Sequence, residues 1–375
     1  MLQHVSIHNY KCFAGFELAL PRQALFVGSN GSGKTSLWDA LAGLQDLIVR
    51  GADVATVFPT NTLTRWRKDE PVQQFAITLD VGGDTGRYEL EIGHDQKRRI
   101  PTIRREELRL NGRTLQRTFE GAVLIQNWVP LSTRLAFSRK LSYLSAIDAS
   151  DENERAIAFR EAIANLWMLA PSSGRLEPTT RTEAPWLERD RANFPSWWRG
   201  VLVERPQVNS QLVEALRPVM PGLQNIAFER ISSEVRELML SFRRENADYK
   251  LSASELSDGQ RSLLLLYGFL FGALDRPATV FMDEPETGLA PHEMQPYLSA
   301  MSEALDRHDG QALVISHHPA VIDYIAPAAT VRFSRPGGGP ARVEEVTLET
   351  TGGTSVSEWL SRSWAYEDEH DEPAP

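Results

Sequence analysis

The segment GSNGSGKT, residues 28–35, limits the fold of this chain more than any other feature of the sequence. It follows a short apolar run, ALFV, and precedes residues 35–50, in which apolar residues recur at helical spacing. Glycines let successive backbone amides of such a loop point at one phosphate group, and the N-terminus of the following helix adds partial positive charge. A strand, a glycine-rich loop and a helix in this order predict a P-loop nucleotide site.

In that loop, Lys34 is expected to reach the β- and γ-phosphates and the Thr35 hydroxyl to bind magnesium. A second segment, VFMDEP at 280–285, ends an apolar strand in two carboxylates. Because it lies downstream of a P-loop, we expect Asp283 to hold magnesium through water and Glu284 to orient or deprotonate the attacking water. ATP and Mg²⁺ are therefore the predicted cofactors, and the loop residues expected to hold the nucleotide are Ser29, Asn30, Gly31, Ser32, Gly33, Lys34, Thr35 and Ser36.

A third segment, LSDGQ at 256–260, places a polar step ahead of the long apolar run 263–274. With these three motifs the chain resembles the ABC-type ATPases, and within them the soluble RecF, SMC and OLD-like branch, which includes compact predicted ATPases. The resemblance covers the opening strand through the P-loop, and then about residue 226 to the strand near residue 332. It implies that the polar step is a signature motif, in which Ser257, Gly259 and Gln260 bind the γ-phosphate of a nucleotide held by another protomer.

The resemblance also implies roles for residues outside these motifs. Gln126 resembles the Q-loop glutamine that senses magnesium and the γ-phosphate, although an ordinary glutamine at a strand end is the alternative. Residues 286–291 correspond to the D-loop, and Lys11 joins the nucleotide contacts. His317 corresponds to the switch histidine, with His318 as its rival because the segment reads Ser-His-His-Pro.

The same resemblance implies an α/β fold: a P-loop NTPase with an ABC-ATPase head, made of a mixed β lobe and a RecA-like parallel sheet, and a helical lobe that carries the signature. The expected domains are the N-terminal part of the ATPase core at 1–135, a helical lobe at 136–225, the C-terminal part of the core at 226–350, and a terminal helix with an acidic tail at 351–375. From the sequence pattern alone we expect a helix over 153–169 and a β-hairpin over 106–116, turned by Asn111-Gly112.

Charge and composition narrow the candidate partners. The net charge is −10, yet residues 97–117 carry eight basic residues against Glu106 and Glu107. This basic tract predicts either contacts with a DNA backbone or a solvated hairpin face. The apolar runs are too short to span a membrane, no secretory leader is evident, and Cys12 alone permits no internal disulfide, so we expect a cytoplasmic protein without a membrane partner. The helix expected at 354–364 docks on the chain's own lobe or on a partner, and the tail at 367–372 is expected to be solvated.

These features favour an ATP-switched homodimer or higher oligomer that acts in DNA transactions or genome defence and controls a separate effector, such as a nuclease. A RecF-like repair mediator is the main alternative. The nucleotide-binding subunit of a transporter is less favoured because a long insertion separates the P-loop from the signature. Prolines through the middle region argue against long coiled coils. A scaffold with decayed motifs is disfavoured because Lys34, Asp283 and Glu284 are all present.

Overall fold

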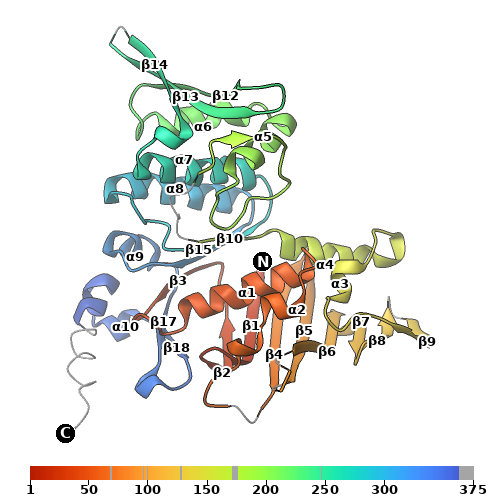
Figure 1. Cartoon of the computed structure of the whole chain (residues 1–375). Helices are drawn as coiled ribbons and strands as arrows, with labels where there is room; N and C mark the ends of the chain where they lie inside the picture. The colour runs from red at the N-terminus through yellow and green to blue at the C-terminus, as the bar shows by residue number, and fades with distance from the viewer. Residues whose placement is uncertain are drawn as a thin grey trace. The chain divides into compact units, whose positions relative to one another are not determined.

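The computed structural model describes residues 1–67, 70–95, 97–98, 100–126, 129–170, 176–245 and 247–362. It divides into two compact units, whose elements are labelled in Figure 1. Unit 1 comprises Met1–Trp167 and Ile325–Pro375, and unit 2 comprises Met168–Tyr324. The acidic tail at 367–372 lies outside the described residues. The domain boundaries expected at 135, 225 and 350 stay predictions.

An eight-stranded antiparallel sheet forms the largest part of unit 1, in the order β2-β1-β4-β5-β6-β7-β8-β9 (Figure 1). Buried residues alternate with more exposed ones along β4 and β5, so one face of each of these two strands is buried. Asn111 and Gly112 both have positive φ, which confirms the turn predicted between β6 and β7. The strands are β1 (Leu2–Tyr10), β2 (Phe13–Ala19), β4 (Val72–Val81), β5 (Asp84–Asp95), β6 (Ile100–Leu110), β7 (Arg113–Phe119), β8 (Ala122–Gln126) and β9 (Val129–Ala136).

Four helices accompany this sheet: α1 (Lys34–Ile48), α2 (Val54–Val57), α3 (Tyr143–Ala146) and α4 (Glu154–Ala164). Helix α1 contacts the other three, and α4 contacts β4. The buried Gln45 amide donates to the carbonyls of Ile163 and Leu166, 3.0 and 2.5 Å away, and so ties α1 to the end of α4.

The helix expected over 153–169 is wrong at its C-terminal end. Helix α4 stops at Ala164, and the last four residues form strand β10 (Leu166–Leu169). A short apolar run has the same pattern in a buried strand and in a buried helix, so periodicity could not place this boundary.

A second set of strands in unit 1 joins the two ends of the chain. Strand β3 (Gln23–Val27) pairs in parallel with β17 (Thr330–Ser334), which pairs antiparallel with β18 (Arg342–Val346). The short helix α10 (Leu348–Thr351) follows, and residues 356–362 are helical again. Leu360 is buried and the Arg332 guanidinium lies 5.3 Å from the Trp359 ring centroid, so this segment packs on the chain's own lobe, as one of the two alternatives predicted.

Unit 2 contains a parallel pair of fully buried strands, β15 (Thr279–Asp283) and β16 (Gln311–Ile315). A small antiparallel sheet has the order β11-β13-β12, with β14 also paired to β13. These strands are β11 (Thr179–Thr180), β12 (Leu223–Arg230), β13 (Arg236–Arg244) and β14 (Ala247–Ser252). The helices are α5 (Phe194–Glu204), α6 (Val208–Leu216), α7 (Asp258–Ala273), α8 (Pro291–Arg307) and α9 (Pro319–Ile325).

Helix α7 is the buried centre of unit 2 and contacts α5, α6 and α8 (Figure 1). Its glycines permit close packing, because a Cβ atom at Gly268 or Gly272 would lie 2.4 Å from the ring of Phe194 or Trp197. The antiparallel and parallel sheets with packed helices confirm the predicted α/β fold class. In the part of the chain that the structure describes, no helix combines the length and hydrophobicity that crossing a bilayer requires.

Candidate nucleotide-binding site

The P-loop connects β3 to α1 in unit 1 and has the backbone shape that its glycines allow. Gly28, Gly31 and Gly33 all have positive φ, at 140°, 77° and 118°. A Cβ atom at Gly28 would lie only 2.2 Å from the carbonyl oxygen of Phe333 in β17, so glycine alone fits there. The loop therefore curls as predicted and packs directly against the neighbouring strand.

Lys34 is buried inside the curve of this loop. Its Nζ donates to the carbonyl oxygens of Gly28 and Ser29, 2.7 and 3.1 Å away, and lies 3.4 Å from Ser32 Oγ. At the N-cap of α1, Gly33 has no side chain to accept hydrogen bonds from the first amides of the helix. A buried ammonium group and a helix N-terminus capped by glycine make this loop chemically suited to an anion.

Arg335 fastens the outer turn of the P-loop, a contact that the sequence analysis missed. Its Nη1 donates to the Gly31 carbonyl oxygen at 3.2 Å, and its other nitrogens donate to Gly338 and Gly339 at 2.8 and 2.9 Å. The guanidinium also lies 5.6 Å from the ring centroid of Trp66. The glycine-rich turn after β17 was the only signal in the sequence for this support, and it names no partner.

Cys12 packs beneath the same loop as a buried residue of the turn between β1 and β2. Its sulfur would lie 3.0 Å from a Cβ atom at Gly33. Burial raises the pKa of its thiol, which keeps the group protonated and unreactive at neutral pH.

Two further predicted nucleotide contacts lie in unit 1. Lys11 forms an ion pair with Asp39 of α1, and its Nζ is 5.5 Å from the ring centroid of Tyr10. Gln126 is the last residue of β8, and its side chain is outside what the structure describes. Their roles toward a nucleotide stay predictions.

The acidic motif follows β15 in unit 2. Asp283 is buried as the last residue of the strand. Glu284 has a positive φ of 46°, and its amide donates to the Ile315 carbonyl oxygen of β16 at 2.9 Å. The two carboxylates thus stand at the carboxyl end of a parallel strand pair, where ligands bind in open α/β sheets.

Glu286 links the predicted D-loop to the segment that follows β16. The Ser316 hydroxyl donates to Glu286 Oε1 at 2.5 Å and accepts from the His318 amide at 3.0 Å. Burial raises the pKa of Glu286. Glu286 therefore holds the segment after β16 through Ser316, a contact that the sequence does not predict.

The two rival histidines differ in their local contacts. The His318 ring accepts a hydrogen bond from the Ala320 amide at 3.2 Å, and its carbonyl accepts from Val321 and Ile322, so it caps α9. His317 lies half-buried between this cap and the buried Ser316. The capping role of His318 supports His317 as the switch histidine, which stays a prediction.

The signature segment begins α7 with a reciprocal cap. Ser257 Oγ accepts from the Gln260 amide at 3.3 Å, while Gln260 Oε1 accepts from the Ser257 amide at 3.1 Å. A Cβ atom at Gly259 would lie 3.2 Å from the Gly288 carbonyl oxygen, so the predicted signature and D-loop touch within unit 2. Ser257 is exposed, and its predicted contact with a second protomer's nucleotide stays a prediction.

The basic tract separates into two groups. Arg105, Arg109 and Arg117 surround the carboxylate of the buried Glu107. Burial alone would raise the pKa of Glu107, but hydrogen bonds from these arginines hold it well below its usual range. These three arginines therefore share one internal anion. Arg98 and Arg104 instead line a pocket, and Arg99 lies outside the described residues.

Most of the chain matches a known protein family. Residues 24–323 match the family described as "AAA domain, putative AbiEii toxin, Type IV TA system". No curated protein matches the chain.

Solved structures of two SMC heads are similar to the chain. One is an Smc head bound to the C-winged helix domain of ScpA, with 14% identity, a TM-score of 0.57, and coverage of 93% of this chain and 98% of that one. The other is an Smc head with an extended coiled coil bound to the C-terminal domain of ScpA derived from Pyrococcus furiosus, with 13% identity, a TM-score of 0.55, and coverage of 98% and 99%. At these identities the likeness shows the fold, which is the ABC/SMC-type head expected from the motifs. Because the family match covers residues 24–323, the chain belongs to the family described as "AAA domain, putative AbiEii toxin, Type IV TA system".

Proposed function

We propose that this chain is an ATPase that binds ATP with Mg²⁺, pairs with a second copy while ATP is bound, and separates after hydrolysis. The single observation that carries the proposal is the P-loop itself, in which the buried Lys34 ammonium lies within a three-glycine curve at the N-terminus of α1. Phosphate oxygens would replace the loop carbonyls as partners of Lys34, because a charged partner forms the stronger hydrogen bond.

The other predicted residues have chemistry that fits these roles. The Thr35 hydroxyl is exposed in the first turn of α1 and Asp283 ends a strand, and both offer the oxygen ligands that magnesium prefers. The metal would neutralise phosphate charge. Glu284 would take the proton of the attacking water, while Gln126 and His317 would sense the γ-phosphate. Ser257, Gly259 and Gln260 would complete the site of the second copy.

We further propose that this cycle controls a separate effector, such as a nuclease, in the cytoplasm during genome defence or another DNA transaction. The family description names a toxin of a type IV toxin–antitoxin system, which supports a function exercised together with another component. The two SMC heads are described as bound to domains of ScpA, which supports a protein partner for this fold. Both arguments come from similar proteins and are tested by purification of the native complex.

The ATPase proposal is tested by Glu284→Gln and Lys34→Ala. Glu284→Gln keeps the side-chain size but removes the base, so ATP should bind, the dimer should persist, and turnover should fall by about 100-fold or more. Lys34→Ala should lose ATP binding. Size-exclusion chromatography with and without ATP, with phosphate release in parallel, measures both. Glu303→Gln, at an exposed position of α8, is the matched control. A Glu284→Gln protein that hydrolyses ATP at the control rate would refute the role of this carboxylate.

A further inference from the structure

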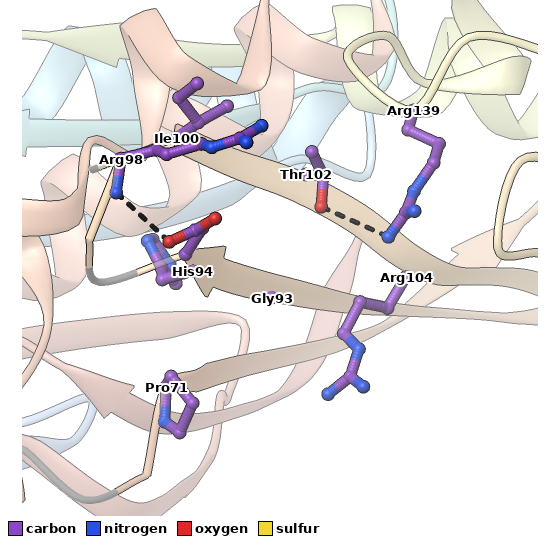
Figure 2. Close-up of a pocket in the computed structure, with 9 residues that line it drawn as sticks. Pro71, Gly93, His94, Arg98, Ile100, Thr102, Arg104 and Arg139 are labelled. Atoms are coloured by element: carbon purple, nitrogen blue, oxygen red, sulfur yellow. Dashed lines mark hydrogen bonds between the residues drawn. The ribbon is translucent and has the colours of Figure 1, made fainter.

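A pocket of about 480 Å³ lies in unit 1 where β5 ends and β6 begins (Figure 2). Its lining includes three arginine side chains, the Thr102 hydroxyl and the apolar surface of Pro71 and Ile100. No residue of the P-loop takes part in this lining, so the nucleotide site already described does not account for the pocket.

The three guanidinium groups come from three separate segments: Arg98 from the turn between β5 and β6, Arg104 from β6, and Arg139 from the segment after β9. The backbone of two of these arginines is held by hydrogen bonds. The Arg139 carbonyl accepts from the Ile103 amide at 2.7 Å, and the Arg104 carbonyl accepts from the Glu120 amide at 2.8 Å. Figure 2 shows Arg139 reaching Thr102, whose hydroxyl accepts its Nη2 at 3.3 Å.

Two glycines leave the space in which these arginines lie. A Cβ atom at Gly93 would be 2.4 Å from Cδ of Arg104, and one at Gly121 would be 2.9 Å from Cγ of Arg139. Gly93 has an ordinary strand conformation, so backbone strain does not explain the glycine at this position. The close approach of the Arg104 side chain explains it, because a Cβ atom would occupy the same space.

The nearby carboxylates do not saturate this cluster. Asp95 Oδ1 already accepts the amides of Lys97 and Arg98, at 2.9 and 3.0 Å. Glu120 is shared between Arg104 and Arg139, at 3.6 and 3.0 Å, and Glu91 lies 3.9 Å from Arg104. Each guanidinium has five N–H donors, so these two carboxylates leave donors of both arginines available to a ligand. Arg104 and Arg139 are also 42% and 41% exposed, which leaves them accessible from solution.

We propose that this pocket, which we call the arginine pocket, binds the phosphate group of a phosphate ester. Guanidinium groups match phosphate geometry through paired N–H donors, and the lining of the pocket supplies three of them and one hydroxyl. The volume is within the range of about 300–1,000 Å³ for small-ligand sites. The ester is either the backbone of a nucleic acid or a free nucleotide. The inference is independent of the proposed ATPase cycle.

The test uses one variant that removes arginine charges from the pocket and one that keeps these charges but displaces an arginine side chain. Arg104→Gln with Arg139→Gln removes two guanidiniums, whereas Gly93→Ala keeps every charge but pushes Arg104 out of its place. The control, Arg243→Gln with Arg276→Gln, removes the same charge at exposed positions of unit 2. Fluorescence anisotropy with a labelled DNA duplex of mixed sequence is measured over a salt series. We expect about a tenfold loss of affinity in both pocket variants, and in the double variant a salt slope smaller by about two, because each lost phosphate contact contributes about 0.9.

A second probe separates the two sources of phosphate. AMP binding is measured by calorimetry in a Lys34→Ala background, in which the P-loop no longer competes. Loss of DNA affinity in the pocket variants assigns the pocket to a nucleic-acid backbone, and loss of AMP affinity alone assigns it to a free nucleotide. The proposal is overturned if the pocket variants bind both probes as tightly as the control, or if the wild-type chain binds neither. Circular dichroism melting confirms that each variant is folded, and ATP binding by the P-loop is measured separately with Lys34 intact.

Discussion

At the scale of single residues, Glu107 shows that part of a basic tract can be held by a buried carboxylate. Its side chain is fully buried on β6, and its Oε1 lies 2.9 Å from Arg109 Nε, 2.5 Å from Arg117 Nη2 and 2.8 Å from Thr114 Oγ1. Arg105 pairs with its other oxygen. The arginines are each about one-third exposed, so water screens part of their attraction. Removing the anion would leave three clustered positive charges.

Glu107→Gln should therefore lower the free energy of unfolding by about 1–2 kcal/mol at pH 7, below the ~3–5 kcal/mol of a fully buried pair because the arginines are screened. Because the folded-state pKa of Glu107 is depressed, its stabilisation is complete above the ordinary glutamate pKa of about 4.3 and is lost as pH falls further. The difference from wild type should thus shrink between about pH 5 and pH 3. Urea unfolding followed by circular dichroism measures it, with Glu234→Gln as the exposed control. If the difference in unfolding free energy between variant and wild type were the same at about pH 5 and pH 3, the depressed pKa of Glu107 would be contradicted.

At the residue scale, the curled backbone of the P-loop could be predicted because its glycines lie close together in the sequence, whereas the roles of the site residues toward a nucleotide stay predictions. Contacts between distant residues could not be predicted. Glu286 and Ser316 are 30 positions apart, and Arg335 and Gly31 are 304 apart. A count of charges likewise could not show that strand register sets Arg117 opposite Glu107. Such pairings depend on the folded sheet, which a single sequence does not specify.

At the scale of elements, helix α7 explains why a polar step precedes a long apolar run. The reciprocal cap of Ser257 and Gln260 satisfies the first amides of the helix, and the rest of it is buried against α5, α6 and α8. The close approach to α5 depends on Gly268 and Gly272, beside which Phe194 and Trp197 are themselves buried. Here glycine serves packing, at some cost in helix propensity.

Gly268→Ala with Gly272→Ala should lower the free energy of unfolding by about 2 kcal/mol, although alanine is the better helix former by about 1 kcal/mol at each site. The added Cβ atoms would lie 2.4 Å from the rings of Phe194 and Trp197, which are themselves buried. Gly200→Ala in α5 is the matched control, because its Cβ would lie 3.5 Å from the nearest atom and should leave stability unchanged or raise it. Thermal unfolding compares the two. If the double variant melts at or above the control temperature, the packing argument fails.

Elements with strong periodicity were predictable, such as the helix after the P-loop and the hairpin turned by Asn111 and Gly112. Strand β10 was not, because Leu166–Leu169 is a short apolar run without alternation. The hydrogen bonds that cap α7 and α9, made by Ser257 and His318, could be identified only from the structure.

At the scale of the whole molecule, the chain leaves unit 1 after Trp167 and returns at Ile325. The P-loop belongs to unit 1, whereas the predicted signature and both motif carboxylates belong to unit 2. In a symmetric dimer of the proposed kind, each active site would combine Lys34 of one copy with Ser257 of the other.

A mixing experiment tests this arrangement. Ser257→Asp keeps a favourable N-cap but sets a negative charge against an incoming γ-phosphate, and Lys34→Ala removes the P-loop cation. Each variant alone should be inactive. After subunit exchange, about half of the dimers should be mixed and carry one intact site, so that about a quarter of the wild-type turnover returns if the sites act independently. Ser257→Asn, which also caps the helix but is uncharged, is the control for the charge. No recovery in turnover or in ATP-dependent association would reject the shared site.

The contact between Gly28 and β17 also means that the P-loop is translated well before the strand that supports it. Strand β3 finds its parallel neighbour in residues 330–334, and the outer turn of the P-loop is fastened by Arg335, which is 304 positions after Gly31. A ribosome adds about 5–20 residues per second, so about 15–60 s separate the two halves of the loop's support. Throughout that interval the nascent chain carries GSNGSGKT without the strand that shapes it. The P-loop therefore lacks the support of β17 and Arg335 until unit 2 has been translated, and an incomplete chain lacks the finished loop that the proposed ATP cycle would require.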